Sequence, residues 1–305
     1  MYTRRKFEEL KFEFVKDIQL YKTLISYSGW NLFGNIAAVA KGQGVNILLN
    51  IFFGPVINAA RGIAIQVQAA VNSFVSNFQM AVNPQIIKSY AADEKDYMLS
   101  LVIRSSKFSF YLLYLLSLPI IIEIDQILKL WLVTVPNYAS IFTILVLIII
   151  LIDCVSGPLM TSVQATGKIK LYQTVVGSLQ FLILPISYFF LKNGYTPETT
   201  LYINIIISII ALIFRILFLK RIINFPVLLF MKEVVLKNIL IVIISFFPLL
   251  FLRTMMETNA LRIITIIVLS ILWSGVLIYY FGLNKTEKKY IYFSIKNLRL
   301  RIFKK

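Results

Sequence analysis

The residues with the clearest chemical potential lie in one otherwise apolar stretch, 58–86, where polar side chains recur at helical spacing. They are Asn58, Arg61, Gln68, Asn72, Ser76, Gln79 and Asn83. On a helix with 3.6 residues per turn, these positions fall within about 80° of one another. Such a face must meet water or neighbouring helices, because lipid tails offer no hydrogen bonds. The chemistry it suggests is binding through amide and guanidinium groups.

A looser polar stripe occurs in the stretch 26–53. Its members are Asn31, Asn35, Gly42, Asn46 and Asn50, which span roughly 100° of arc on the same helical geometry. Two neighbouring amphipathic helices of this kind would line a hydrated cavity, and we favour this interpretation for the combined stripes. A single asparagine is more often explained by a hydrogen bond that holds two helices together.

Four ionisable side chains fall inside apolar stretches, where charge is costly and usually functional. Lys41 lies in the middle of its stretch and off the asparagine stripe, so we expect it to face a different neighbour. Asp153 is the candidate for a coupling proton or cation site, or for an internal partner of Lys41. Arg61 either faces the cavity or anchors the outer flank. Arg215 lies about one turn from two further basic residues, so we expect it to reach the inner headgroups.

Residues for covalent or metal chemistry are missing from the sequence. It has no histidine and one cysteine, Cys154, which excludes serine–histidine triads, an internal disulfide and nearly all zinc or haem sites. No GxxxxGK[ST] motif is present to bind ATP. Glu123 and Asp125 fall at the end of a stretch, where we expect them to be solvated. We therefore predict no enzyme activity, no cofactor and no metal.

The composition requires a membrane to position these residues. Of the 305 residues, 59% are hydrophobic and 15% are charged, whereas soluble domains carry roughly 25% charged residues. Apolar stretches of about 20 residues can cross a bilayer as helices. We identify eight, at 26–53, 58–86, 108–124, 139–163, 174–191, 200–219, 238–252 and 262–283. The expected fold is an all-α integral membrane protein with about eight transmembrane helices.

The basic residues indicate how these stretches are oriented. The 31 Lys and Arg residues are concentrated in alternate flanks, beginning with the N-terminal flank, and flanks of this kind stay in the cytoplasm. The alternation requires 58–86 to cross the membrane, although its polarity is high enough for a hydropathy window to miss it. Both termini are therefore predicted to be cytoplasmic. The net charge of +17 is explained by the orientation of the helices in the membrane, so nucleic-acid binding is a poor interpretation of it.

The two ends of the chain are not predicted to cross the membrane. Residues 1–25 place apolar side chains three to four positions apart with lysines between them, which is typical of an amphipathic helix on anionic inner-leaflet lipids. Residues 284–305 form a basic tail that we also expect in the cytoplasm. The eight predicted transmembrane stretches lie between these two ends, within residues 26–283.

Four runs of residues carry a family resemblance: SGWNLFG at 28–34, QGVNILLNIFFGP at 43–55, NAARGIA at 58–64 and NPQIIKSY at 83–90. They resemble the polysaccharide-biosynthesis flippases, the translocases of O-antigen and other lipid-linked oligosaccharides. These transporters belong to the MATE-like multidrug/oligosaccharidyl-lipid/polysaccharide exporter superfamily. The later stretches match this family only in length, polarity and spacing.

The resemblance implies alternating access at the bacterial inner membrane. A cationic, hydrated cavity would take up undecaprenyl-pyrophosphate-linked oligosaccharide for O-antigen, capsule or exopolysaccharide biosynthesis. Lys41 and Arg61 would meet the pyrophosphate, and a set of amides would meet sugar hydroxyls: Asn35, Asn46, Asn58, Gln68 and Asn72. Family members have two six-helix lobes and in some cases an extra pair of helices. The resemblance implies that residues 26–219 form a six-helix membrane lobe like the second of these, and that residues 220–283 form the extra transmembrane pair with its cytoplasmic connection. We therefore expect a first lobe from a longer chain or from a partner, or a homo-oligomer.

Three other functions stay open. A cation-coupled drug exporter of the same superfamily would prefer a more apolar or acidic cavity, whereas here the cations inside the membrane outnumber the acid. A membrane glycan polymerase or ligase generally needs a large outer loop, and the predicted outer loops are short. The third is a non-catalytic assembly partner or pseudogene product, which the expected need for a first lobe keeps open.

Overall fold

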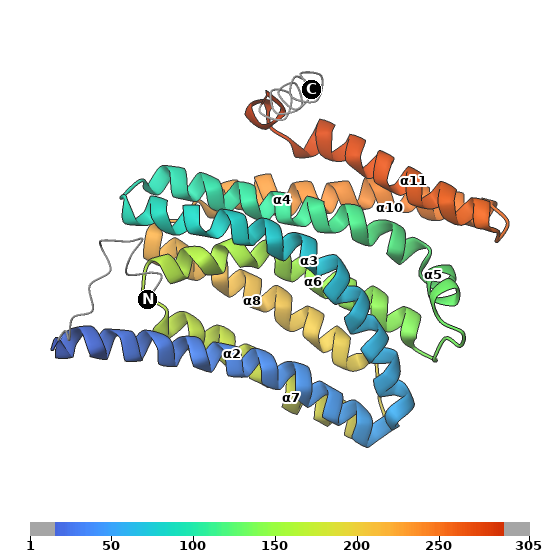
Figure 1. Cartoon of the computed structure of the whole chain (residues 1–305), viewed down its shortest axis with the longest axis horizontal. Coiled ribbons are helices and arrows are strands. Elements are labelled where there is room, and N and C mark those ends of the chain that lie inside the picture. The colour runs from blue at the N-terminus through green and yellow to red at the C-terminus, as the bar shows by residue number, and fades with distance from the viewer. Residues whose placement is uncertain (1–15, 290–305) are drawn as a thin grey trace, which may run out of the picture.

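The computed structural model describes residues 16–289, and every regular element in that range is a helix (Figure 1). In chain order these elements are α2 (Ile18–Phe53), α3 (Pro55–Ala91), α4 (Lys95–Ile122), α5 (Ile124–Trp131), α6 (Ala139–Ala165), α7 (Lys170–Lys192), α8 (Thr199–Ile223), α9 (Val227–Phe230), η1 (Met231–Leu236), α10 (Lys237–Met255), α11 (Ala260–Leu277) and η2 (Ile278–Gly282). The predicted all-α class is confirmed. The predictions for residues 1–15 and 290–305 lie outside the described residues.

Seven helices in the described range are long and apolar enough to cross a bilayer. They are α2, α4, α6, α7, α8 and two composite helices, Val227–Met255 and Ala260–Gly282, in which the π-helical turns η1 and η2 are continuous with their α-helical neighbours. Helix α3 is not among them, because its polar stripe lowers its hydropathy. It nevertheless packs along α6 through the bundle (Figure 1). The chain is therefore a multi-pass membrane protein with about eight long helices.

A glycine–proline step separates the two helices that carry the polar stripes. Gly54 has a φ of 79°, a positive value that a residue with a side chain resists, and its N–H donates to the Asn50 carbonyl at 3.0 Å. Pro55 then opens α3 at a position where a helix needs no N–H from it. The chain thus reverses within a single residue, so the start of α3 lies beside the end of α2, where Arg61 contacts Asn46. Farther from this turn, α2 packs along α7 and α3 packs along α6.

Helix α2 begins earlier than predicted. The Asp17 carboxylate accepts hydrogen bonds from the backbone N–H groups of Gln19 and Leu20, at 2.8 and 3.1 Å, and so caps the helix at Ile18. Residues 18–25, which we predicted to form a separate amphipathic segment, are therefore continuous with the first long helix.

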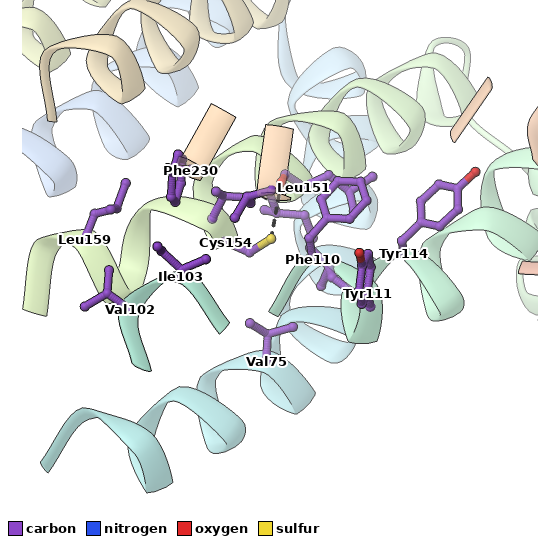
Figure 2. Close-up of a cluster of buried hydrophobic side chains, with 14 of the residues drawn as sticks. Val75, Val102, Ile103, Phe110, Tyr111, Tyr114, Leu151, Cys154, Leu159 and Phe230 are labelled. Atoms are coloured by element: carbon purple, nitrogen blue, oxygen red, sulfur yellow. Dashed lines mark hydrogen bonds between the residues drawn. The ribbon is translucent and has the colours of Figure 1, made fainter. Parts of the chain in front are cut away.

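Helices α4 and α6 form the buried centre of the bundle. In Figure 2, Phe110, Tyr111 and Tyr114 of α4 lie against the segment of α6 that contains Cys154. The rings of Phe110 and Tyr114 are stacked with centroids 5.6 Å apart. Since Cys154 points into this apolar cluster, its neighbour Asp153 is turned toward the other side of α6. Packing of the core thus sets the direction of the acidic side chain.

Two clusters of ion pairs connect the last helices to α4. At one end of the bundle, Glu123 is fully buried and lies 3.1 Å from Arg262 and 3.7 Å from Arg253. Near the middle of α4, Lys107 pairs with Glu287; both are buried, and they are 2.7 Å apart. The expectation that Glu123 is solvated is therefore wrong, because the returning helices α10 and α11 cover the end of α4 and bring two arginines to it.

Candidate functional site

Five helices converge on a polar cavity of about 470 Å³, which we call the Lys41 cavity. Its lining residues are Ala38, Lys41, Gly42, Gln43, Asn46, Arg61, Ile65, Gln68, Val146, Ile149, Asp153, Gln180, Leu201 and Asn204. Helices α2, α3 and α6 contribute its charged groups, and α7 and α8 contribute one amide each. Ligand sites in proteins commonly measure roughly 300–1,000 Å³. The cavity is therefore large enough for a polar headgroup.

Arg61 is the most confined charged residue of this cavity. Its side chain is buried, and its Nη1 donates to Asn46 Oδ1 at 2.6 Å. Asn46 Nδ2 in turn donates to Gln43 Oε1 at 3.3 Å, so the two amides of α2 orient the guanidinium. Arg61 Nε is buried without a hydrogen-bond partner among the described residues. The site thus holds the arginine in place while leaving part of its hydrogen-bonding capacity unused.

Lys41 and Asp153 face the same cavity from helices α2 and α6. The Lys41 ammonium is attracted by the Asp153 carboxylate and repelled by Arg61 and Arg215, yet within the described range it forms no salt bridge. Our expectation that Lys41 faces a different neighbour from the asparagine stripe is therefore wrong. The cavity extends far enough around α2 to include both Lys41 and Asn46.

A second polar cavity, of about 360 Å³, lies beside the first, and we call it the Arg215 cavity. Its lining residues are Tyr27, Asn31, Gly34, Asn35, Ala38, Met160, Gln164, Tyr172, Gln173, Val176, Gly177, Gln180 and Arg215. Arg215 is buried, and its Nε donates to the Tyr172 hydroxyl at 3.1 Å. The expectation that Arg215 reaches the headgroups is wrong, because Tyr172 of α7 holds its side chain inside the bundle.

The four buried basic side chains of the described region fall into two classes. Lys107 and Arg262 are 1% and 6% exposed, and each has a carboxylate partner, Glu287 or Glu123. Arg61 and Arg215 are 8% and 7% exposed, and neither forms a salt bridge with another described residue. A buried charge is expensive unless it is paired. The two uncompensated arginines are the ones that line the polar cavities, where an anion or water can reach them.

The structure gathers some of the predicted site residues and separates others. Lys41, Arg61, Asn46, Gln68 and Asp153 all line the Lys41 cavity. Asn35 lines the Arg215 cavity, whereas Asn58 and Asn72 line neither.

Gln79, another residue of the polar stripe of α3, links neighbouring helices by hydrogen bonds. Its Nε2 donates to Ser109 Oγ and to the Cys154 carbonyl, both at 2.9 Å. The polar stripe of α3 therefore lines a cavity in one part and links helices by hydrogen bonds in another, because α3 is long enough to contact different neighbours along its length.

Several polar residues of the two cavities were not singled out from the sequence. Gln180 of α7 and Asn204 of α8 are isolated amides within apolar runs, and Gln173 of α7 donates to Asn31 Oδ1 at 3.3 Å. A lone amide in an apolar helix is a weak signal, because it serves equally well as glue between helices. The packing of α7 against α2, and of α8 against α6 and α7, is what identifies these amides as cavity residues.

Comparisons with protein-family models, with curated proteins and with solved structures find no match to this chain.

Proposed function

We propose that this chain takes part in moving an undecaprenyl-pyrophosphate-linked oligosaccharide across a bacterial inner membrane, with both termini in the cytoplasm. The observation that carries the proposal is Arg61, a buried cation without a carboxylate partner among the described residues, set in a polar cavity inside a membrane bundle. The resemblance of residues 28–90 to the polysaccharide-biosynthesis flippases supports the same function.

The chemistry of the lining residues suits the two parts of such a headgroup. Guanidinium and ammonium groups form strong charge-assisted hydrogen bonds with phosphate oxygens, so Arg61 and Lys41 would hold the pyrophosphate. Amides both donate and accept hydrogen bonds, as sugar hydroxyls do, so Gln43, Asn46 and Gln68 would meet the first sugar. Moving this headgroup through the bilayer requires no bond to be made or broken, only an aqueous route with matched polar groups.

Asp153 is the candidate for coupling to an ion gradient. It lines the cavity and attracts Lys41 without forming a salt bridge with it. A proton or monovalent cation at Asp153 would cancel that attraction and leave Lys41 free for the pyrophosphate. Ion binding and headgroup binding would then favour each other.

The Lys41 cavity accommodates only part of an oligosaccharide. The translocation route therefore needs further residues, from outside this bundle, to enclose the rest of the substrate. A face of α3 carries exposed polar side chains, Gln66, Asn72, Ser73, Ser76 and Asn77, which lipid tails would not solvate. A partner lobe, or a second copy of this chain, would close the route over this face. Anionic inner-leaflet lipids would contact the basic residues at the cytoplasmic end.

The test is translocation in vesicles prepared from native membranes, where any partner lobe is present. A fluorescent undecaprenyl-pyrophosphate-linked oligosaccharide is supplied on one side, and a membrane-impermeant quencher reports its movement. Arg61→Gln is expected to slow translocation by at least tenfold, because a hydrogen bond to a charged group contributes about 1.5–3 kcal/mol. Lys88→Gln removes an exposed charge from the same helix and should not change the rate. Equal rates for Arg61→Gln and the wild type would contradict the proposal.

One observation favours a second candidate, a cation-coupled drug exporter: an acidic residue, Asp153, lies in the cavity. The two functions differ in which residue matters. A drug exporter predicts that ethidium efflux is lost with Asp153→Asn and retained with Arg61→Gln, whereas oligosaccharide translocation requires Arg61.

A further inference from the structure

The Lys41 and Arg215 cavities are neighbours along the bundle. Two residues, Ala38 of α2 and Gln180 of α7, line both of them. On α8, Asn204 belongs to the Lys41 cavity and Arg215 to the Arg215 cavity, which places these residues about 16 Å apart along the helix at 1.5 Å per residue. The two cavities together therefore cover about half of a hydrocarbon core that is roughly 30 Å thick.

The Arg215 cavity has the features of a built anion site. Arg215 is 7% exposed, and Tyr172 fixes its Nε. Asn31 and Gln173 are linked by a hydrogen bond in the same wall. In the described chain no carboxylate forms a salt bridge with Arg215, although two other buried cations of the same bundle have such a partner. A cation that the fold orients but does not neutralise keeps its charge available for an anion from outside the chain.

The two cationic sites interact across the boundary between the cavities. Lys41 lies within electrostatic range of both Arg61 and Arg215. An anion between them would therefore be attracted to both sides, and Gln180, which lines both cavities, is placed to donate a hydrogen bond to it. This arrangement places one cationic site in each cavity, with the amide of Gln180 between them.

We propose that the Arg215 cavity is a second phosphate-binding site, in which Arg215 and the Tyr172 hydroxyl hold a pyrophosphate before it passes Gln180 to Lys41 and Arg61. Arg215 lies toward the end of α8 that carries Lys220 and Arg221, the end assigned to the cytoplasm by its basic residues. The Arg215 cavity would thus receive the headgroup first. This inference rests on the proposed function and adds the order in which the cations act.

The test places one cysteine reporter in each cavity of the full chain, in a Cys154→Ala background and in phosphatidylcholine nanodiscs. Asn31→Cys reports on the Arg215 cavity and Gln68→Cys on the Lys41 cavity. The rate of modification by a charged methanethiosulfonate reagent is measured with and without farnesyl pyrophosphate. We expect the probe to slow modification of both reporters by at least tenfold.

The arginine variants then assign each protection to a cavity. Arg215→Gln should remove protection of Asn31→Cys and leave that of Gln68→Cys, and Arg61→Gln should do the reverse. Arg215→Lys should retain partial protection, which separates charge from folding, and Tyr172→Phe should weaken protection of Asn31→Cys. Arg221→Gln, an exposed change on the same helix, should alter neither reporter.

Two outcomes would overturn this inference while leaving the proposed function intact. One is protection of Gln68→Cys alone, and the other is protection of Asn31→Cys that survives Arg215→Gln. Protection of neither reporter would overturn both proposals. A further arm replaces the probe with phosphatidylglycerol in the nanodiscs. If that lipid protects Asn31→Cys and farnesyl pyrophosphate does not, the site binds phospholipid headgroups and the assignment to the translocated pyrophosphate is wrong.

Discussion

At the scale of single residues, the informative contrast is between buried cations that have a carboxylate and buried cations that do not. Lys107 and Arg262 are ion-paired within the bundle, and each has a partner that is far away in the sequence. Arg61 and Arg215 are oriented by neutral groups, Asn46 and the Tyr172 hydroxyl. Buried basic residues of the same bundle therefore fall into a pair that holds helices together and a pair for which we propose a binding role.

Removing one partner of a buried ion pair should destabilise the protein. Lys107→Gln leaves Glu287 buried and unpaired, and losses of about 3–5 kcal/mol are typical of such changes. We expect a clear fall in the melting temperature in detergent. The double variant Lys107→Gln/Glu287→Gln should recover much of the loss, because no uncompensated charge remains. Equal melting temperatures for Lys107→Gln and the wild type would argue against this pairing.

Removing an uncompensated cation should have the opposite effect. Arg61→Gln takes a charge out of the bundle without stranding a carboxylate, so the ligand-free protein should be as stable as the wild type or more stable. The same melting measurement checks this, with Lys88→Gln as the control for a lost charge on α3. A fall as large as that of Lys107→Gln would mean that Arg61 supports the fold.

At the scale of helices, close packing of α3 against α6 depends on a glycine. A Cβ at Gly157 would meet the Gln79 side chain, with the Gln79 Cδ only 2.8 Å away, and Gln79 is held by two hydrogen bonds. Gly157→Ala should therefore cost about 1–3 kcal/mol, the range typical of overpacking. Gly29→Ala is the matched control, since a Cβ there meets nothing within 4 Å. It should not lower the melting temperature, and a fall equal to that of Gly157→Ala would contradict this account.

Helical periodicity predicted the elements well because each long helix carries its own signal in the sequence. The polar stripes identified α2 and α3 and brought Asn46 and Arg61 to the same site, which the structure confirms. The ends of the helices were less predictable. The Asp17 cap extends α2 beyond its predicted start, and α4 begins before the predicted stretch 108–124, which left out its polar first turns. Spacing could not distinguish Gln79 from Gln68, because only the packing of α6 determines which amide links helices and which lines a cavity.

At the scale of the whole molecule, the features that the sequence did not predict are contacts between residues far apart in the chain. Glu123 and Arg262 are far apart along the chain, as are Lys107 and Glu287, and nothing local indicates that they pair. The Arg215 cavity was missed for the same reason, because it forms only where α7 brings Tyr172 against α8. Composition and the length of the apolar stretches were enough for the all-α membrane class.

The exposed polar face of α3 predicts water beside the bundle. In a Cys154→Ala background, Ser73→Cys should react with a charged maleimide at least tenfold faster than Ile36→Cys, because thiols react as thiolates, which require water. Both positions are exposed in this chain, so they form a matched pair. The experiment uses vesicles from native membranes, where a partner lobe would line the same aqueous route. Equal, slow labelling at both positions would show that this face is dry.

The most direct test of the central claim is the effect of a pyrophosphate on the stability of the Arg61 variant. Melting temperatures are measured for the wild type, Arg61→Gln and Lys88→Gln, each with and without farnesyl pyrophosphate. A ligand that binds only the folded protein stabilises it by about 2.7 kcal/mol at one hundred times its dissociation constant. We predict a rise of several degrees for the wild type and Lys88→Gln, and a smaller rise for Arg61→Gln, in which only the Arg215 cavity still binds the probe. An equal rise in all three proteins, or none in the wild type, would contradict the account.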